Sequence, residues 1–275
     1  MKYEMVVGKD FRYNVCRKGV EHIIFTDEVA PKEKGVELED LSNDFDGSVV
    51  GWIKDGTYKV STQTKGQKVI FNEDSSYMFH ERIGSYIKSI DVNNIDTTHV
   101  TNMRGMFAFC ENLKELDLNN FDTSKVTDMS HMFAYCNFKH INLSNFDTSK
   151  VENMGYLFYS CHSLEKIDLN CLDTSNVTDM NNMFHGCLAL CELDITPMDT
   201  SKVENMAFMF SWCKNLAELD LSSFDTSQVV EMHGMFSTCE KLKNLDLSHF
   251  NTTKVENMDN MFSWCKNLES LNLSI

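Results

Sequence analysis

Hydrophobic and polar positions recur in a fixed order from about residue 75 to the end of the chain. In residues 116–136, LDLNNFDTSKVTDMSHMFAYC, alternating leucines precede a short polar run, which leads into methionines, Phe133 and Cys136. This self-similarity predicts a solenoid, in which each unit packs only against its neighbours. Aligning the units on the DTS-like triplet gives one column with steps of 26, 25, 26, 26, 26 and 26 residues: Asp96, Asp122, Asp147, Asp173, Asp199, Asp225 and Asn251.

Each unit begins with a leucine-rich stretch of the form LxxLDLS. In the first such unit Leu113, Leu116 and Leu118 occupy the apolar positions. Alternation of apolar and polar residues is typical of a short, half-buried strand. We therefore expect parallel strands along one face of the solenoid.

The second half of each unit has a different apolar spacing. Val126, Met129, Met132 and Phe133 follow one another at intervals of three, three and one, which would put them on one face of a short helix. Three units also carry the pattern of a capping box, in which a hydroxyl and a glutamate satisfy the first backbone amides of a helix. These are residues 149–152, 201–204 and 253–256. The pattern predicts strand, turn and helix in each unit.

The first part of the chain lacks the repeat. Residues 52–60, WIKDGTYKV, set Asp55-Gly56 between alternating residues, which predicts a two-residue hairpin turn. The runs EHIIF and QKVIF predict further short strands, and the acidic stretch between them a surface loop. We interpret residues 1–74 as a small β-rich cap and residues 75–275 as about seven repeats plus a partial unit at Met78-Phe79. A separate ligand-binding domain in the first segment is the alternative.

Composition narrows the choice of partners. The 275 residues are 42% hydrophobic, enough for a sizeable core, and the formal net charge is −16. That charge would repel nucleic acid and anionic lipid. Charges interrupt every short apolar run, so we expect no spanning segment, no signal peptide and no membrane insertion.

The ten cysteines follow the repeat as well. Seven of them form a column: Cys110, Cys136, Cys161, Cys187, Cys213, Cys239 and Cys265. A disulfide or metal ladder is one interpretation, and Cys187 with Cys191 is the one local pair that could start a zinc site. No CxxC pair and no histidine column accompany the cysteines, so buried, reduced thiols are the simpler prediction. The recurring methionines and phenylalanines are predicted to be core.

These motifs resemble a known family. The L-x-x-L-x-L start, the F-D-T-S-x-V-x-x-M-x-x-M-F centre and the single cysteine look like the BspA-like leucine-rich repeat proteins, over about residues 75–275. The resemblance implies a right-handed α/β solenoid, with parallel strands on one face and helices on the other, and a role in surface binding or adhesion. Family members described as surface proteins carry export signals and anchors, and none is visible here. The compartment therefore stays open.

An acidic column marks the outward positions of the leucine-rich stretches. It contains Asp91, Asp117, Asn142, Asp168, Asp194, Asp220, Asp246 and Asn272, and the more variable column before it contains Glu192 and Glu218. We expect Asp117, Asp168, Asp194, Asp220, Asp246, Glu192 and Glu218 to bind a basic protein or peptide. Calcium held by these oxygens is a weaker alternative. In the other interpretation the aspartates are solvated and bonded to neighbouring amides. They would then recur only because a repeat copies its residues whether or not each one is used.

No catalytic constellation interrupts the repeat. A glycine-rich phosphate loop is absent from the sequence, and His131, His162, His185 and His233 occupy scattered positions in their units. We therefore expect a non-enzymatic binding module without a cofactor. The alternatives are a structural spacer or homo-oligomer joined through the uncapped carboxyl-terminal end, and an enzyme with its site in residues 1–72.

Overall fold

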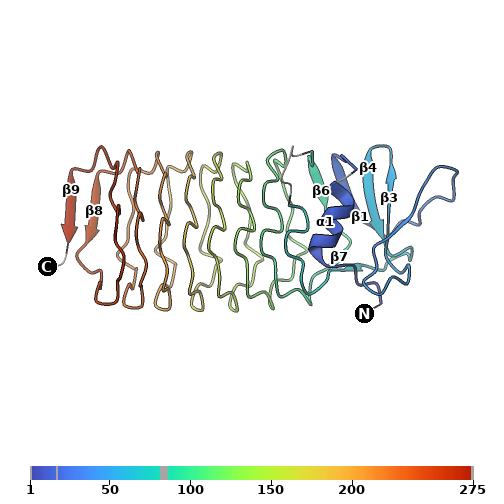
Figure 1. Cartoon of the computed structure of the whole chain (residues 1–275), viewed down its shortest axis with the longest axis horizontal. Coiled ribbons are helices and arrows are strands. Elements are labelled where there is room, and N and C mark those ends of the chain that lie inside the picture. The colour runs from blue at the N-terminus through green and yellow to red at the C-terminus, as the bar shows by residue number, and fades with distance from the viewer. Residues whose placement is uncertain (1, 17, 81–85, 274–275) are drawn as a thin grey trace.

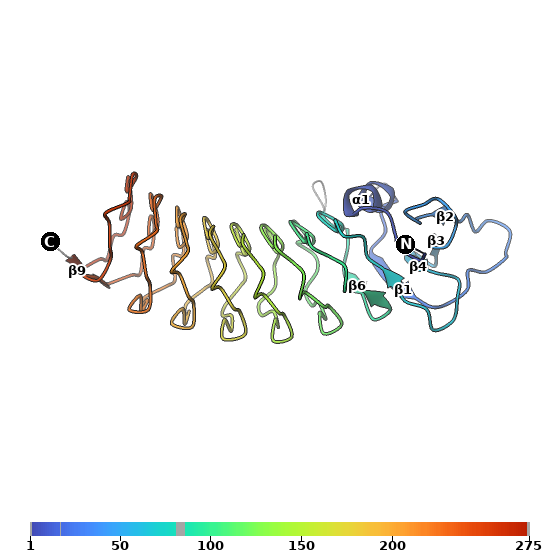
Figure 2. The same cartoon turned by 90° about the horizontal axis from the view of Figure 1, so that it is seen from below.

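The repeats form a row of coils stacked along one long axis (Figure 1). The computed structural model describes residues 2–16, 18–80 and 86–273. The amino-terminal elements lie at one end of the row, and strands β8 (Asn244–Leu247) and β9 (Ser270–Leu273) lie at the other (Figure 1). Seen after a quarter turn, the coils are thin blades standing side by side (Figure 2).

The described residues of the amino-terminal segment form one helix and five strands. These are α1 (Gly8–Cys16), β1 (His22–Thr26), β2 (Glu39–Asp40), β3 (Val50–Lys54), β4 (Thr57–Ser61) and β5 (Val69–Ile70). The hairpin at Asp55-Gly56 is confirmed, because β3 and β4 pair antiparallel and both turn residues have positive φ, 50° and 76°. The runs EHIIF and QKVIF also contain the expected strands, β1 and β5.

Helix α1 was not expected in a β-rich segment. Its apolar residues Phe11 and Val15 lie four positions apart, so they share one face and are both buried. Phe11 contacts the rings of Phe25, Tyr58 and Phe79 edge-on or tilted. The helix thus packs between the small sheet and the first repeat.

The sheet of this segment continues into the repeats. Its strand order is β2-β3-β4-β1-β6, and β6 (Ser89–Asp91) belongs to the first coil. β1 pairs with β6 in parallel, and β5 pairs in parallel with β7 (Ile95–Asp96). One hydrophobic core runs from Met5 to Met261 without interruption. The segment therefore shares both hydrogen bonds and core with the first coil.

A ladder of isolated parallel bridges confirms the repeat period. Each coil contributes one residue, and consecutive members pair: Asp74, Asn102, Asp128, Asn153, Asp179, Asn205, Glu231 and Asn257. From Asn102 onward these residues follow the spacing of the DTS column. The first bridge, between Asp74 and Asn102, extends the same ladder to the residues just before Met78-Phe79.

The short helices predicted in the repeats are wrong. In residues 154–161, a Met–Phe segment, the amides of Met154, Tyr156 and Phe158 donate to carbonyls of the next coil at 2.8–3.0 Å. The amides in between, such as Leu157 and Tyr159, donate to the residue three positions back. A helix would instead bond every amide to the residue four positions back. The capping boxes fail for the same reason, since the Glu152 amide donates to the Thr127 carbonyl and not to Ser149.

Left-handed residues explain why these segments are not helical. Two positions per coil, four residues apart, have positive φ, as at Tyr156 (61°) and Ser160 (54°). Such residues cost free energy in a right-handed helix and turn the chain sharply instead. The residues with the apolar spacing of three, three and one therefore lie in two consecutive tight turns. Their methionines and phenylalanines point into the core.

The leucine-rich stretches are extended but form named strands only near the ends, as β6, β8 and β9. In the middle coils, for example residues 164–169, Leu164, Ile167 and Leu169 are buried as predicted. Few backbone bonds join these leucine segments; the Glu165 amide donates to the Lys139 carbonyl at 3.1 Å. The Met–Phe segments therefore carry the denser ladder between coils.

The predicted core columns are confirmed except in the last coil, where Met258 is 43% exposed and Phe262 is half-buried. The rings of Phe79, Phe107, Phe133, Phe158, Phe184, Phe210, Phe236 and Phe262 stack in sequence, with centroids 5.2–6.0 Å apart. Offset stacking of this kind adds to the free energy gained from burying each ring.

Candidate binding surfaces

The acidic column is exposed along the leucine segments, in the outward position that the sequence predicts. Each aspartate uses one carboxylate oxygen locally, because its Oδ1 accepts the amide of the residue two positions on. The distances are 3.0 Å for Asp117, Asp168 and Asp194 and 2.9 Å for Asp220 and Asp246. These bonds are the ones foreseen by the simpler interpretation of solvated, turn-bonded aspartates.

Hydrogen bonding keeps several of these carboxylates ionised. The amide and the side chain of Asn170 lower the pKa of Asp168. The hydroxyl and amide of a serine two positions on lower the pKa of Asp220 and of Asp246 in the same way. The row therefore stays negative at neutral pH. Glu192 and Glu218 lie exposed beside it, and in the described part of the chain neither they nor the five aspartates form an ion pair with a lysine or arginine.

The aspartates of the DTS triplets bond their own turns, as predicted. The Ser124 amide donates to Asp122 Oδ1 at 3.0 Å, and its hydroxyl donates to the same oxygen at 2.6 Å. This pairing lowers the pKa of Asp122. The turn leads into a non-helical segment, so the expected helix cap is absent.

A buried threonine ladder joins the coils beside these aspartates and was not predicted. The Thr174 hydroxyl donates to the Asp199 carbonyl at 2.8 Å and accepts the Asp199 amide at 2.8 Å. Equivalent threonines are nearly inaccessible: Thr97, Thr123, Thr148, Thr174, Thr200 and Thr226. The triplet's threonine is thus the structural residue, which explains its recurrence in the sequence.

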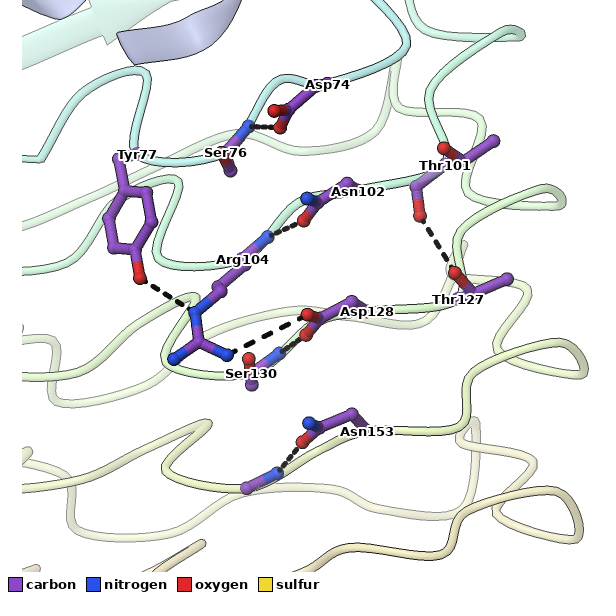
Figure 3. A network of polar contacts seen from close by, with 11 residues as sticks. Asp74, Ser76, Tyr77, Thr101, Asn102, Arg104, Thr127, Asp128, Ser130 and Asn153 are labelled. Atoms are coloured by element: carbon purple, nitrogen blue, oxygen red, sulfur yellow. Dashed lines mark hydrogen bonds and ion pairs between the residues drawn. The ribbon is translucent and has the colours of Figure 1, made fainter.

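The polar side chains at the bridge positions accept hydrogen bonds from backbone amides two residues further along the chain (Figure 3). The Arg104 amide donates to Asn102 Oδ1 at 2.9 Å, and the Ser130 amide donates to Asp128 Oδ1 at 2.8 Å. Arg104 also crosses the coils, with its Nε donating to the Tyr77 hydroxyl at 2.7 Å and its guanidinium 4.0 Å from Asp128. These contacts hold the first coils in register.

The cysteine column is buried inside the stack. Each thiol contacts the carbonyl oxygen of a core phenylalanine in the preceding coil, as Cys161 does to Phe133 at 3.1 Å. Burial raises the pKa of Cys161 and Cys213 to about 12. The cysteines of this column are free, and Cys191 is exposed while Cys187 is buried. The predicted buried, reduced thiols are confirmed for six members of the column, and Cys265 in the last coil is half-buried.

Aromatic side chains gather on the outer edge of the Met–Phe segments, a surface that the sequence interpretation missed. Phe109 stacks on Tyr135 with centroids 4.2 Å apart, and His131 stacks on Tyr156 at 4.3 Å. Further contacts lead through Tyr159 to His185, Phe208 and His233. The available signal was the enrichment of Tyr, Trp and His directly around the core phenylalanines, as in MFAYC, LFYSC and MFSWC.

Two histidines on this edge are unusual. Burial lowers the pKa of His131 to about 4 and also lowers the pKa of His185. The Nδ1 atom of each ring is buried and has no hydrogen-bond partner in the structure. Both rings therefore stay neutral at physiological pH.

A cleft with a volume of about 680 Å³ opens beside His185. It is bordered by Ser160, His185, Gly186, Trp212, Lys214 and Glu240, among others. Lys214 Nζ lies 4.6 Å from the centre of the Trp212 ring and 2.9 Å from Glu240. The cleft thus combines an aromatic wall with charges of both signs.

The described residues contain neither a cluster suited to a metal ion nor a helix suited to a bilayer. Within residues 2–16, 18–80 and 86–273, no group of three or more His, Cys, Asp or Glu side chains is arranged to hold a metal ion. In the same ranges, none of the helices has the length and apolar character needed to cross a bilayer.

Sequence comparison identifies the family. The profile described as "Mycoplasma protein of unknown function, DUF285" matches residues 73–193 and 188–274, so the chain belongs to the DUF285 family. The match covers the repeats, and its description assigns no function. No curated protein matches the chain. The finer resemblance to the BspA-like proteins stays a prediction.

Two solved structures show weaker likenesses. A leucine-rich repeat protein from Eubacterium ventriosum ATCC 27560 is 17% identical, with a TM-score of 0.40; the match covers 78% of this chain and 57% of that protein. A leucine rich cell surface protein from Faecalibacterium prausnitzii A2-165 is 11% identical, with a TM-score of 0.18; that match covers 93% of this chain and 88% of the other. Neither protein informs the ligand or partner of this chain.

Proposed function

We propose that the protein is a non-enzymatic binding module that captures a basic protein or peptide along the acidic column. The observation that carries the proposal is the row of exposed carboxylates at Asp117, Asp168, Asp194, Asp220 and Asp246, without ion-pair partners among the described residues. Rows of one charge sign on a rigid scaffold attract oppositely charged segments and set their register. Glu192 and Glu218 extend the row sideways and would contribute to the choice of partner.

Decalysine is a suitable first probe, titrated by calorimetry at low and at physiological salt. The test variant replaces Asp168, Asp194 and Asp220 by Asn, which keeps the turn bond and removes three charges. Each exposed ion pair contributes about 0.5 kcal/mol, so the affinity should fall by about tenfold and its salt dependence should flatten.

A matched control separates the column from net charge. Replacing Asp173, Asp199 and Asp225 by Asn removes the same number of charges from the DTS turns of neighbouring coils. This control should bind decalysine within about threefold of the unmodified protein, since its charges lie outside the column. Equal losses in the two triple variants would reduce the effect to net charge and contradict the proposal.

Self-association through the last coil is the second candidate. Leu271 and Leu273 of β9 and Trp264 are exposed, the last at 71%. A cavity of about 150 Å³ lies beside them, bordered by Leu247, Phe250, Met258 and Leu273. If a second copy covers this surface, sedimentation equilibrium will show a mass that rises with concentration, and Leu271→Asp or Leu273→Asp will abolish the rise. A constant monomer mass would eliminate this candidate.

A further inference from the structure

One position in each coil places its side chain on the aromatic edge, so these side chains lie at a regular spacing along the stack. It lies two residues after each core phenylalanine and is occupied by Phe109, Tyr135, Ser160, Gly186, Trp212, Thr238 and Trp264. We call it the edge position. Consecutive coils bond here through the backbone, as from the Gly186 amide to the Ser211 carbonyl at 2.8 Å. Where two neighbours are aromatic, at Phe109 and Tyr135, their rings stack 4.2 Å apart.

Ser160 and Gly186 interrupt this stack of rings. Two coils in a row thus have no ring at the edge position, immediately beside the indole of Trp212, which is 45% exposed. The cleft of about 680 Å³ opens at this interruption. A Cβ atom placed on Gly186 would lie 3.0 Å from the Ser160 hydroxyl oxygen, so these two small residues pack closely against each other. The geometry of the repeat therefore leaves room for a ring supplied by another molecule.

The polar lining of the cleft carries charges of both signs. Glu240 accepts from Lys214 at 2.9 Å and lies 3.5 Å from Lys266, and Lys241 adds a further cation to the border. Asn215 and His185 add further polar groups to the border. A charged ligand would face a charge of its own sign, whereas a polyhydroxylated molecule can accept from lysine and donate to glutamate.

We propose that this cleft binds a neutral carbohydrate, with one pyranose ring stacked against Trp212 above Gly186. The apolar face of the sugar ring would cover the indole, and its hydroxyls would bond Lys214, Asn215 and Glu240. Trp and Tyr suit such contacts because they offer a large apolar face beside a polar group. The site is separate from the acidic column and stands or falls independently of it.

The probe is an array of neutral oligosaccharides, made of glucose, N-acetylglucosamine, galactose or mannose, with sialylated and sulfated counterparts. The tightest neutral ligand is then titrated by calorimetry. Two variants act on the site from opposite directions: Trp212→Ala removes the wall, and Ser160→Tyr restores a ring in the gap. Ser160 already has the positive φ of Tyr135, so the backbone accepts the change. Trp264→Ala is the matched control, since Trp264 has the same register and also lies beside a lysine, Lys266.

At least one neutral oligosaccharide should bind, and both Trp212→Ala and Ser160→Tyr should weaken it by tenfold or more. Trp264→Ala should change its affinity by less than twofold. The proposal is overturned if no neutral sugar binds, if only the anionic counterparts bind, or if binding survives both variants. Circular dichroism of each variant would verify that the stack of coils is intact.

Discussion

The two sides of each coil are built from similarly apolar residues but are held together differently. The Met–Phe segment, as in residues 154–161, sends alternate amides to the next coil and stacks its phenylalanines. The leucine segment, as in residues 164–169, buries comparable side chains but makes few backbone bonds between coils. The contacts that hold neighbouring coils together therefore lie mainly in the Met–Phe segments. The other side is free to carry the exposed acidic column.

The largest expected effect comes from the ring stack. Phe184→Ala removes a fully buried ring that stacks on two neighbours, so the free energy of unfolding should fall by about 3–5 kcal/mol. Leu219→Ala, in a half-buried leucine position, should cost about 1–2 kcal/mol. Chemical denaturation of both variants measures the difference. Equal losses would contradict the assignment of cohesion to the Met–Phe side.

An intermediate effect is expected at the threonine ladder. Thr174→Val keeps the shape but leaves the Asp199 amide and carbonyl without their buried partner, which should cost about 1–3 kcal/mol. Thr178→Val is the matched control, because Thr178 is exposed and its hydroxyl bond to Glu152 is longer, at 3.2 Å. The control should lose less than about 0.5 kcal/mol on denaturation. If Thr178→Val lowered the free energy of unfolding as much as Thr174→Val, the buried threonine ladder would stabilise the protein no more than an exposed threonine does.

The stability of the protein should also depend on pH. Because the pKa of His131 falls from 6.5 to about 4 on folding, the unfolded chain binds the extra proton first, and stability declines as pH drops from 6.5 to 4. The lowered pKa of Asp168 acts in a different window, since its contribution is lost only below about 3.8. Denaturation between pH 7 and 4 should show a steeper decline in the unmodified protein than in His131→Phe, which keeps the ring stack. Parallel curves would exclude this role of His131.

Much of this architecture could be predicted from the sequence. The period, the phenylalanine and cysteine columns, the hairpin at Asp55-Gly56 and the turn bonding of the DTS aspartates all follow from recurring residue types with a local physical role. The helices could not be separated from paired tight turns, because Met180, Met183 and Phe184 have the same spacing in either structure. Gly186, Asn182 and Gly234 hinted at left-handed positions, but Tyr156 and Phe208 hold the same conformation without any signal in their type.

The candidate sites differ in the same way. The acidic column could be predicted from the sequence because one residue type repeats at one position in most coils. The proposed carbohydrate cleft lies where Ser160 and Gly186 interrupt the aromatic residues at the edge position. It can be recognised only when the register between coils, which places Trp212 beside these two residues, is known. Columns of one residue type stand out in a repetitive sequence, whereas positions that interrupt a column do not. Resolving them requires knowing which positions of consecutive coils face each other.

Native-state hydrogen exchange tests the contrast between the two sides most directly. The amides of Tyr156 and Phe158 donate to the next coil, whereas those of Ile167 and Leu169 donate no hydrogen bond in the described part of the chain. The structure predicts that the first pair exchanges more slowly than the second by on the order of 100-fold. Equal protection on both sides, or the continuous protection of a helix through residues 154–161, would contradict this account.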